Sequence, residues 1–278
     1  MVGSKRIVLG VTDLKSLFQS IKSKYSIDYS NYALSSFKKR LEDFMEKYHI
    51  FKFDELVHKF ETDSDFFQLF IAFHLVDSTE MFRDPEFWSE LKTSILSKYS
   101  SPNEIKVLIP ESNSGEEIYS FQIICSQLGL LKKVNIFVTT VFEPNKERIL
   151  DGDQDSKKME INVANFERFQ EGVDLMDYFV KRINNSGFKP ELMENVEVRT
   201  LDIVSEEIPG IYDFILFRNK MLYFNPQLKN EVLRKLDTVL KPGGYIAVGI
   251  KESVDHPSWE NSYTLISESE RIYKKKLA

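Results

Sequence analysis

The sequence predicts a Rossmann-like α/β domain preceded by an all-α region, and three observations support this fold class. Residues 214–217 form an unbroken apolar run, which is typical of a parallel strand covered on both faces. Asn225-Pro226 and a helical apolar pattern follow, and Pro242-Gly243-Gly244 precedes a second apolar strand at Tyr245. From Asp13 to about Ser97, by contrast, the pattern is helical and shows no strand alternation.

The segment from Ile211 to Gly249 therefore reads as a strand–helix–strand unit around which the chain is organised. Its central loop follows Phe217, at the carboxyl end of the first strand, where open α/β sheets bind ligands. Arg218, Asn219 and Tyr223 line this loop. We expect the ligand site of the domain here.

Composition limits the protein class. The 278 residues, 42% of them hydrophobic, suffice for a large packed core, and the apolar run near the amino terminus is too short for a signal peptide. No stretch is long enough to span a membrane, so we expect a cytoplasmic protein without membrane insertion. The net charge of −6 argues against broad nucleic-acid binding. Lys38, Lys39 and Arg40 form a basic patch that either meets an acidic partner or is a solvated helix face.

Disulfide and metal chemistry are not indicated. Cys125 is the single cysteine and lies in an apolar helical pattern, which predicts a small buried side chain. The four histidines, including His74 and His256, are scattered without metal-ligand spacing, so we expect no metal site.

Helices are expected over about 14–21, over a segment capped by Ser30, over 53–60 and over 63–75. Residues 77–85 interrupt this pattern at the junction with the α/β half. On residue types alone, Thr79 is a helix cap there and Arg83 an ion-pair partner of Asp84 or Glu86.

In the α/β half, a strand is expected from Ile105, followed by a helix in which Ser114 and Glu117 form a capping box. The remaining expected elements follow in chain order: a strand over 134–139, a helix over 144–150, a loop over 151–158, a helix over 174–183, a turn over 184–187, a strand over 197–203, and strands around 264–266 and 271–273.

Several separated segments resemble one family, the chemotaxis receptor methyltransferases of CheR type. They are KKRLEDFMEKY in the helical half, STEMFRDPEFW at the junction, SNSGEEIYS after the first strand, YDFILFRNKMLYF in the centre and PGGYIAVGIKES near the end. Their order and spacing make the resemblance specific, and together they cover nearly the whole chain.

The resemblance implies a methyltransferase, a transferase of chemotaxis signal transduction that moves a methyl group from S-adenosyl-L-methionine to receptor glutamates. It implies an all-α domain over 1–98 and a methyltransferase-like α/β domain over 99–278, with a shortened β subdomain around 179–198. The expected partner is a chemoreceptor-like or other signalling protein. The oligomeric state is left open.

The resemblance also implies roles for individual residues. Thr79 and Arg83 match junction residues that touch the cofactor, with Arg83 acting near the methyl group, and Glu116 matches a glutamate near the methionine moiety. Tyr223, matched to an aromatic residue after the central strand, is the second catalytic candidate, and we expect it near Arg83 and Asn219. The remaining cofactor-binding candidates are Asp202 and Ile203, beside the adenine, and Asn219 and Lys220, at the end of the central strand.

The residue types fit this chemistry. A glutamate acceptor is already ionised at pH 7, so its methylation needs no general base but needs placement of the reacting atoms and exclusion of water. Arg83 would orient the acceptor carboxylate and Glu116 would pair with the cofactor's ammonium.

Three positions depart from the family pattern. Glu111 lies where the family has a glycine-containing loop, Thr140 replaces the acidic residue expected to bind ribose, with Glu143 three residues on, and Lys220 adds a cation near a cationic cofactor. A glutamate held at positive φ would cost roughly 1–2 kcal/mol. The alternative function is therefore a catalytically degenerate methyltransferase fold that acts as a binding or scaffolding module.

Overall fold

A computed structural model describes residues 9–25, 27–74, 79–98, 104–152, 156–182, 186–254 and 257–277. The chain divides into two compact units, one formed by residues 1–76 and 221–231 and the other by residues 77–220 and 232–278. The start of the junction, part of the expected 184–187 turn, His256 and the side chain of His74 lie outside what is described. The expected domain boundary at residue 98 stays a prediction.

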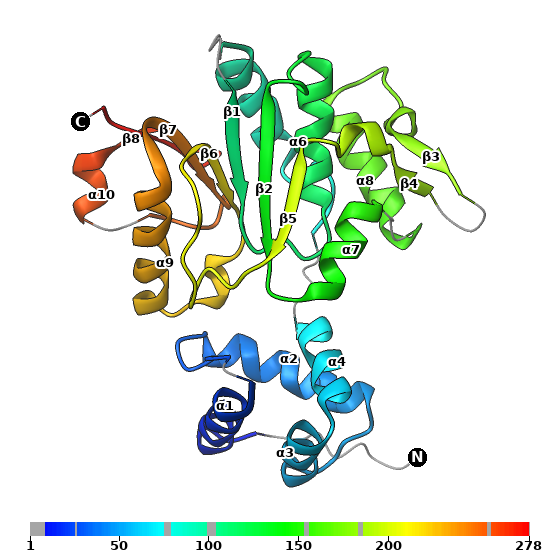
Figure 1. The fold of residues 1–278 in the computed structure, drawn as a ribbon, viewed down its shortest axis with the longest axis vertical. Coiled ribbons are helices and arrows are strands. Elements are labelled where there is room, and N and C mark those ends of the chain that lie inside the picture. Colours follow the sequence, from blue (N-terminus) through cyan, green and yellow to red (C-terminus); the bar gives the residue numbers. More distant parts are fainter. Residues whose placement is uncertain are drawn as a thin grey trace. The chain divides into compact units, whose positions relative to one another are not determined.

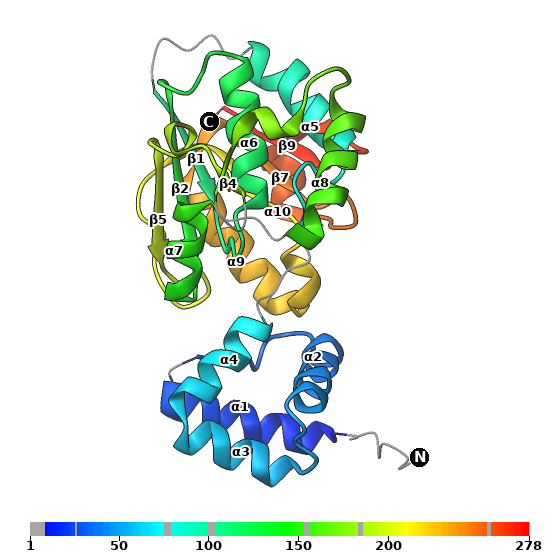
Figure 2. The ribbon, with the colours of Figure 1, turned by 90° about the vertical axis from the view of Figure 1, so that its right-hand side faces the viewer.

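The first unit is built from helices around an aromatic core. Its helices are α1 (Val11–Tyr25), α2 (Leu34–Lys47), α3 (Phe53–Thr62) and α4 (Ser64–His74), with the short helix η5 (Met221–Tyr223) and the start of α9 (Pro226–Val239). Figure 2 shows α1 alongside α3. Phe44, Phe60 and Phe70 are almost fully buried, and the ring centroids of Phe60 and Phe70 are 5.0 Å apart. This burial supplies the hydrophobic stabilisation of the unit.

The expected cap of α2 at Ser30 is wrong. The helix begins at Leu34, and its N-cap residue, Ala33, makes no side-chain capping bond. The backbone N–H of Ala33 instead donates to the Tyr223 carbonyl at 2.8 Å, and Tyr32 forms an antiparallel bridge with Phe224. Because residues 32–33 pair as extended backbone, the helix starts only after them.

The second unit contains a seven-stranded sheet in the order β5-β2-β1-β6-β7-β9-β8. The strands are β1 (Ile105–Ile109), β2 (Val134–Thr140), β5 (Val196–Thr200), β6 (Tyr212–Phe217), β7 (Leu240–Val248), β8 (Tyr263–Ser267) and β9 (Ile272–Lys275). The first five in this order pair in parallel, whereas β9 pairs antiparallel with β7 and β8. β6 is the central strand and every residue of it is buried, as its apolar run predicts.

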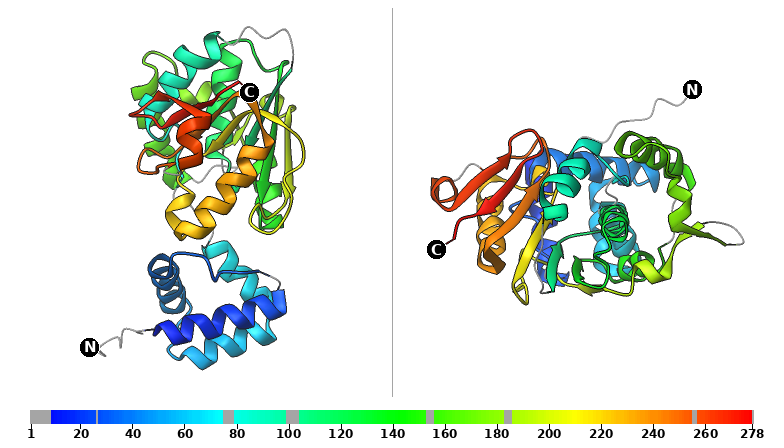
Figure 3. Two further views of the ribbon diagram at one scale, coloured as in Figure 1. Left: turned by 90° about the vertical axis from the view of Figure 1, so that its left-hand side faces the viewer. Right: turned by 90° about the horizontal axis from the view of Figure 1, so that it is seen from above.

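Helices cover both faces of this sheet. Figure 1 and the two views of Figure 3 show α6 (Glu116–Gln127), α7 (Glu143–Asp151) and α8 (Ser156–Phe169) on one side, and α9 and α10 (Pro257–Ser262) on the other. Before β1 come α5 (Pro85–Glu90), η1 (Leu91–Ile95) and η2 (Leu96–Lys98). The expected Rossmann-like sheet with an all-α amino-terminal region is thus confirmed.

Local sequence patterns predict some elements of this unit correctly and others wrongly. Asn225 caps α9, because its side-chain oxygen accepts the N–H of Leu228 at 2.9 Å, as predicted. The helix expected over 174–183 is wrong: a short 3₁₀ turn, η3 (Leu175–Tyr178), leads into β3 (Phe179–Lys181). β3 pairs antiparallel with β4 (Ser186–Phe188) in a two-stranded sheet, and the turn η4 (Pro190–Leu192) follows. β7 begins at Leu240 rather than Tyr245, because the register shifts between Tyr212 and Phe214 and accommodates the glycines.

Two expectations about burial can also be compared with the structure. Cys125 is fully buried, as predicted, and this burial raises the pKa of its thiol far above the ordinary value. None of the helices in the described ranges combines the length and apolarity needed to cross a membrane.

Candidate functional site

The site candidates of the second unit gather along one edge of the sheet. β1, β2, β5 and β6 run parallel, so the loops that follow them emerge at the same edge. The chain leaves β1 toward α6 on one face, whereas the segment after β6 leads toward α9 on the other. This reversal between neighbouring strands is the topological switch point at which open α/β sheets bind ligands.

Glu116, in the first turn of α6, is the centre of a buried polar cluster. The residue is 5% exposed, and its Oε2 accepts hydrogen bonds from the hydroxyl of Thr79 at 2.6 Å and from that of Ser114. Its Oε1 accepts the ammonium of Lys158 at 3.1 Å. The structure therefore brings together Thr79 and Glu116, two of the predicted cofactor residues, although they are 37 positions apart.

The capping box expected at the start of α6 is wrong. Gly115, at φ +90°, is the N-cap residue and provides no side chain, while the Ser114 hydroxyl donates to Glu116 and lies 2.8 Å from the Thr79 hydroxyl. A Cβ atom at Gly115 would lie 2.5 Å from the hydroxyl oxygen of Tyr119. Glycine is therefore required here for both its backbone conformation and its small size.

Arg218, directly after β6, forms a second buried cluster. It is 3% exposed, and its guanidinium contacts Asp84 at 2.7 Å and Glu117 at 3.5 Å. Its Cζ lies 3.8 Å from the ring centroid of Phe87. Arg218 thus ties the junction segment, the first turn of α6 and the end of the central strand together through charge-assisted contacts.

Glu117 differs electrostatically from its neighbour Glu116. Burial raises the pKa of Glu117 above its ordinary value, and the charges of Arg218 and Lys220 only partly oppose this effect. Lys220 is itself 7% exposed, so the cation that the sequence identified as a departure acts on Glu117.

Asn219 is held by a residue that the sequence analysis missed. Its backbone has φ +61°, and its N–H donates to Oε2 of Glu252 at 2.8 Å, while the N–H of Gly249 donates to the same oxygen at 2.6 Å. A Cβ at Gly249 would lie 2.5 Å from Oδ1 of Asn219. Glu252 thus holds the ends of β6 and β7 together. Its contact with Asn219 could not be predicted from local patterns, because the two residues are 33 positions apart.

Asp202 and Ile203 lie in the tight turn after β5. The carboxylate of Asp202 accepts the N–H of Val204 at 2.8 Å and the hydroxyl of Ser205 at 2.7 Å, and Ile203 is fully buried. The Ile203 carbonyl accepts the Lys235 ammonium at 3.0 Å. The turn belongs to the same sheet edge, and within the described residues its side chains form no hydrogen bond or ion pair with the Glu116 cluster.

The structure shows the surroundings of Glu111 and Thr140, two of the positions that depart from the family pattern. Glu111 has φ +54°, the left-handed conformation that favours glycine, so the predicted conformational cost applies. Thr140 is fully buried, and its hydroxyl oxygen accepts the Asn145 amide at 3.4 Å. Glu143 is bonded to Thr200 of β5 and paired with Lys146 at 3.4 Å, so its carboxylate is already engaged at the surface.

The two catalytic candidates fall in different units. Arg83 lines a cavity of about 580 Å³ together with Ile161, Arg168 and Ile250. Arg83 and Asn219 are the sequence neighbours of Asp84 and Arg218, which form an ion pair at 2.7 Å, and their shared cleft stays a prediction. Tyr223 belongs to the first unit, so its expected proximity to Arg83 stays a prediction.

Within the first unit, the basic patch is internally paired. Arg40 donates to the Tyr223 hydroxyl at 2.7 Å, and its Cζ lies 4.4 Å from the ring centroid of the same residue. Lys38 pairs with Glu42 at 3.8 Å and Lys39 with Asp43 at 3.7 Å. The lysines therefore form ordinary helix-surface pairs, while Arg40 positions the predicted catalytic tyrosine.

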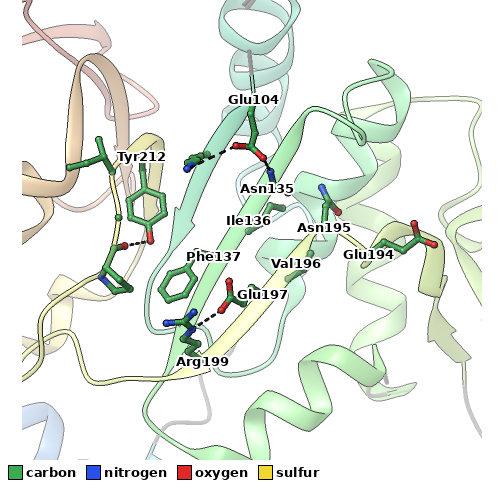
Figure 4. A pocket seen from close by; sticks show the side chains of 14 residues that line it. Glu104, Asn135, Ile136, Phe137, Glu194, Asn195, Val196, Glu197, Arg199 and Tyr212 are labelled. Carbon is green, nitrogen blue, oxygen red and sulfur yellow. Dashed lines mark hydrogen bonds and ion pairs between the residues drawn. The ribbon is translucent and has the colours of Figure 1, made fainter. Parts of the chain in front are cut away.

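A second cavity, of about 440 Å³, lies on the sheet face near the amino-terminal halves of the strands (Figure 4). The segment 201–211 joins β5 to β6 without a helix, which leaves this face open. Phe137 and Tyr212 line the cavity, and Arg199 stacks over the Phe137 ring at 5.2 Å. None of the predicted site residues is among its lining residues.

The Glu116 cluster suits the ammonium of an amino-acid moiety, because the structure already places an ammonium there, that of Lys158. At Thr140, where the resemblance predicts a carboxylate for the ribose, the structure has a buried hydroxyl with Asn145 as its partner. No group of three or more metal-ligating side chains occurs among the described residues. The residues present thus fit S-adenosylmethionine. Glu116 offers a carboxylate for its amino-acid end, and Thr140 and Asn145 offer neutral partners for its ribose.

Comparison with known proteins supports this ligand. The family described as "CheR methyltransferase, SAM binding domain" matches residues 77–269, and "CheR methyltransferase, all-alpha domain" matches residues 12–73. The chain is 24% identical to Cher3 of Pseudomonas putida over 95% of this chain and 96% of that protein. It is 26% identical to chemotaxis protein methyltransferase 1 of Pseudomonas aeruginosa, over 78% and 81% of the two chains. The match of the SAM-binding family over residues 77–269 assigns S-adenosylmethionine as the cofactor of the α/β half.

The Arg218 cluster predicts a large stability effect. Arg218→Met should lower the free energy of unfolding by about 3 kcal/mol. The reason is that it removes a buried cation from Asp84 and Glu117, whose side chains are only 20% and 17% exposed. Arg168→Met, which removes an exposed arginine paired with Glu86, is the control and should cost at most about 1 kcal/mol. Urea denaturation of both variants measures this, and equal effects would contradict the role of Arg218.

The raised pKa of Glu117 predicts a pH dependence. Above its ordinary value of 4.5, the folded protein holds a proton on Glu117 that the unfolded chain has lost, so this group's contribution to stability falls as pH rises through that window. Glu117→Gln cannot titrate, so its stability relative to wild type should improve as pH rises above 4.5. Denaturation curves at several pH values measure the difference, with Glu147→Gln as an exposed control. A relative stability that worsens with pH would show that Arg218 dominates instead.

Proposed function

The chain belongs to the CheR methyltransferase family, and on this premise we propose that it is an enzyme that methylates glutamate carboxylates. The acceptor would be a chemotaxis-type receptor or a related signalling protein, and the reaction would occur in the cytoplasm. The observation that carries this proposal is the Thr79–Glu116 pair at the carboxyl edge of the sheet, since it presents a carboxylate where the cofactor's ammonium is expected.

S-adenosylmethionine supplies, when bound, a methyl group activated by its sulfonium. Glu116 would bind the ammonium of its amino-acid moiety, with Thr79 and Ser114 holding the carboxylate in place. Asn219 is kept at the end of β6 by Glu252, in a position to contact the same ligand. Asp202 and Ile203 would lie beside the adenine. The turn that carries them is held by Lys235, whose ammonium donates to the Ile203 carbonyl.

Arg83 is the residue proposed to orient the acceptor. A glutamate acceptor is ionised near pH 7, so the enzyme needs no general base, and a guanidinium can hold one carboxylate oxygen toward the methyl group. The cavity beside Arg83 is partly walled by Ile161 and Ile250, whose side chains are 42% and 37% exposed. Covering these apolar walls with an acceptor helix would exclude water, which favours a reaction that neutralises charge.

Tyr223 is proposed as the second catalytic residue, on family resemblance. Its hydroxyl accepts a hydrogen bond from Arg40, which fixes the orientation of the ring. The surface of α2 that carries Lys38 and Lys39 is proposed to meet the acidic surface of the helical partner.

A binding or scaffolding protein without catalysis is the second candidate function. The positive φ of Glu111 and the buried Thr140 favour it, because both lie where tight cofactor binding needs a small residue and a carboxylate. The two candidates differ in whether cofactor binding and transfer occur, which the following experiments measure.

The first experiment titrates the protein with S-adenosylhomocysteine by calorimetry. Glu116→Gln should weaken binding by about 10-fold to 100-fold, since a charge-assisted hydrogen bond contributes about 1.5–3 kcal/mol. Glu147→Gln, an exposed glutamate on α7, is the control. Transfer is measured separately as alkali-labile methyl ester, released as methanol, on a helical receptor fragment. Binding that is unaffected by Glu116→Gln would contradict the assignment of this subsite.

The second experiment tests the departures. Glu111→Gly combined with Thr140→Asp should tighten S-adenosylhomocysteine binding, because glycine relieves the left-handed strain and aspartate adds a charged acceptor for the ribose hydroxyls. Lys220→Val can be added to remove the nearby cation. A wild-type protein that already binds at low micromolar concentration would show that the two residues are adequate. Absence of binding in every variant would favour the scaffolding function.

A further inference from the structure

Lys158 contacts two residues, Thr79 and Glu116, that the family resemblance assigns to the cofactor. Its Nζ donates to Oε1 of Glu116 at 3.1 Å and to the backbone carbonyl of Thr79 at 3.1 Å. The acceptors come from the first turn of α6 and from the junction segment, whereas Lys158 comes from the start of α8. One ammonium thus bridges three segments of the second unit.

The chemistry of this site is that of an amino-acid ammonium subsite. The Oε2 atom of Glu116 is occupied by the hydroxyls of Thr79 and Ser114, so Oε1 and the Thr79 carbonyl are the acceptors that face the Lys158 cation. A carboxylate and a carbonyl, held at hydrogen-bond distance from one nitrogen, suit any primary ammonium. A lysine side chain and the α-ammonium of S-adenosylmethionine present the same donor group.

We propose that Lys158 occupies the subsite of the cofactor's α-ammonium and competes with the cofactor for Glu116. This inference rests on the proposed function, because it takes Glu116 as the ammonium acceptor. Two ammonium groups cannot share these acceptors without close repulsion of like charges. Cofactor binding therefore requires the Lys158 ammonium to leave. The apparent dissociation constant equals the intrinsic one divided by the fraction of molecules in which the ammonium has left.

The position of Lys158 permits this withdrawal. Its side chain is 26% exposed, while that of Glu116 is 6% exposed, so the lysine end of the pair reaches solvent and the carboxylate end does not. A lysine ammonium on a flexible four-carbon stem can move into water without a backbone change. Glu116 would keep its two hydroxyl donors and remain in place for the cofactor.

A structural role for Lys158 makes the opposite prediction. If its main effect were to hold Glu116 in a productive position, removing the ammonium would loosen the carboxylate and weaken cofactor binding. The sign of the change in affinity therefore distinguishes competition from positioning.

The test is a calorimetric titration of the full chain with S-adenosylhomocysteine, comparing wild type, Lys158→Met and Lys132→Met. Methionine keeps the length and apolar stem of lysine without its charge, and Lys132 is an exposed lysine outside the cluster. Lys158→Met should bind about 10-fold more tightly than wild type, and Lys132→Met should bind like wild type. Lys158→Gln provides a second neutral variant if the methionine variant folds poorly.

A second ligand makes the test specific for the ammonium. 5′-Methylthioadenosine has the nucleoside and thioether but no amino-acid group, so Lys158→Met should leave its affinity unchanged. Tighter binding of both ligands would indicate a general opening of the pocket and would overturn the proposal. Equal or weaker binding of S-adenosylhomocysteine by Lys158→Met would also overturn it while leaving the proposed function intact. Failure of all variants to bind S-adenosylhomocysteine would overturn both proposals.

Discussion

The buried Arg218 guanidinium at the end of the central strand is the interaction on which the arrangement of the site depends. Asp84, Glu117 and the ring of Phe87 surround it, and together they connect the junction segment to α6 and β6. A buried cation with two carboxylate partners is satisfied only in one geometry, because separating any partner leaves an uncompensated charge. Arg218 therefore fixes the position of Asp84, the sequence neighbour of Arg83, relative to the sheet.

Two adjacent glutamates at the start of α6 have different cationic partners. Glu117 contacts Arg218, and burial raises its pKa, whereas Glu116 is held by two hydroxyls and Lys158. The positive end of the helix dipole favours both carboxylates. Of these two carboxylates, Glu116 has the more exposed cation, because the Lys158 side chain is 26% exposed and that of Arg218 only 2%. Glu116 is therefore the member of the pair from which a ligand's ammonium can displace a protein group.

Much of the fold and part of the site could be predicted from the sequence. The apolar run of β6 and the Asn225 cap of α9 depend on local patterns, and the resemblance identified Thr79 and Glu116, which the structure brings together. Lys158 was missed because its segment read as a loop, and because its contact with Glu116 spans 42 residues. Glu252 was missed for the same reason, since its two backbone partners lie beyond the reach of local periodicity. Ser30 and Ser114 were assigned as caps, but tertiary contacts engage the neighbouring backbone or their hydroxyls instead.

The most direct measurement is a crystal structure of the protein with S-adenosylhomocysteine. The ligand's ammonium should lie within hydrogen-bond distance of Oε1 of Glu116 and of the Thr79 carbonyl, with the Lys158 ammonium turned into solvent and the Arg218 cluster unchanged. A ligand bound elsewhere, such as in the cavity beside Phe137 and Tyr212, would show that Glu116 is not the ammonium acceptor. A ligand in the site with Lys158 still on Glu116 would show that the two ammonium groups do not compete.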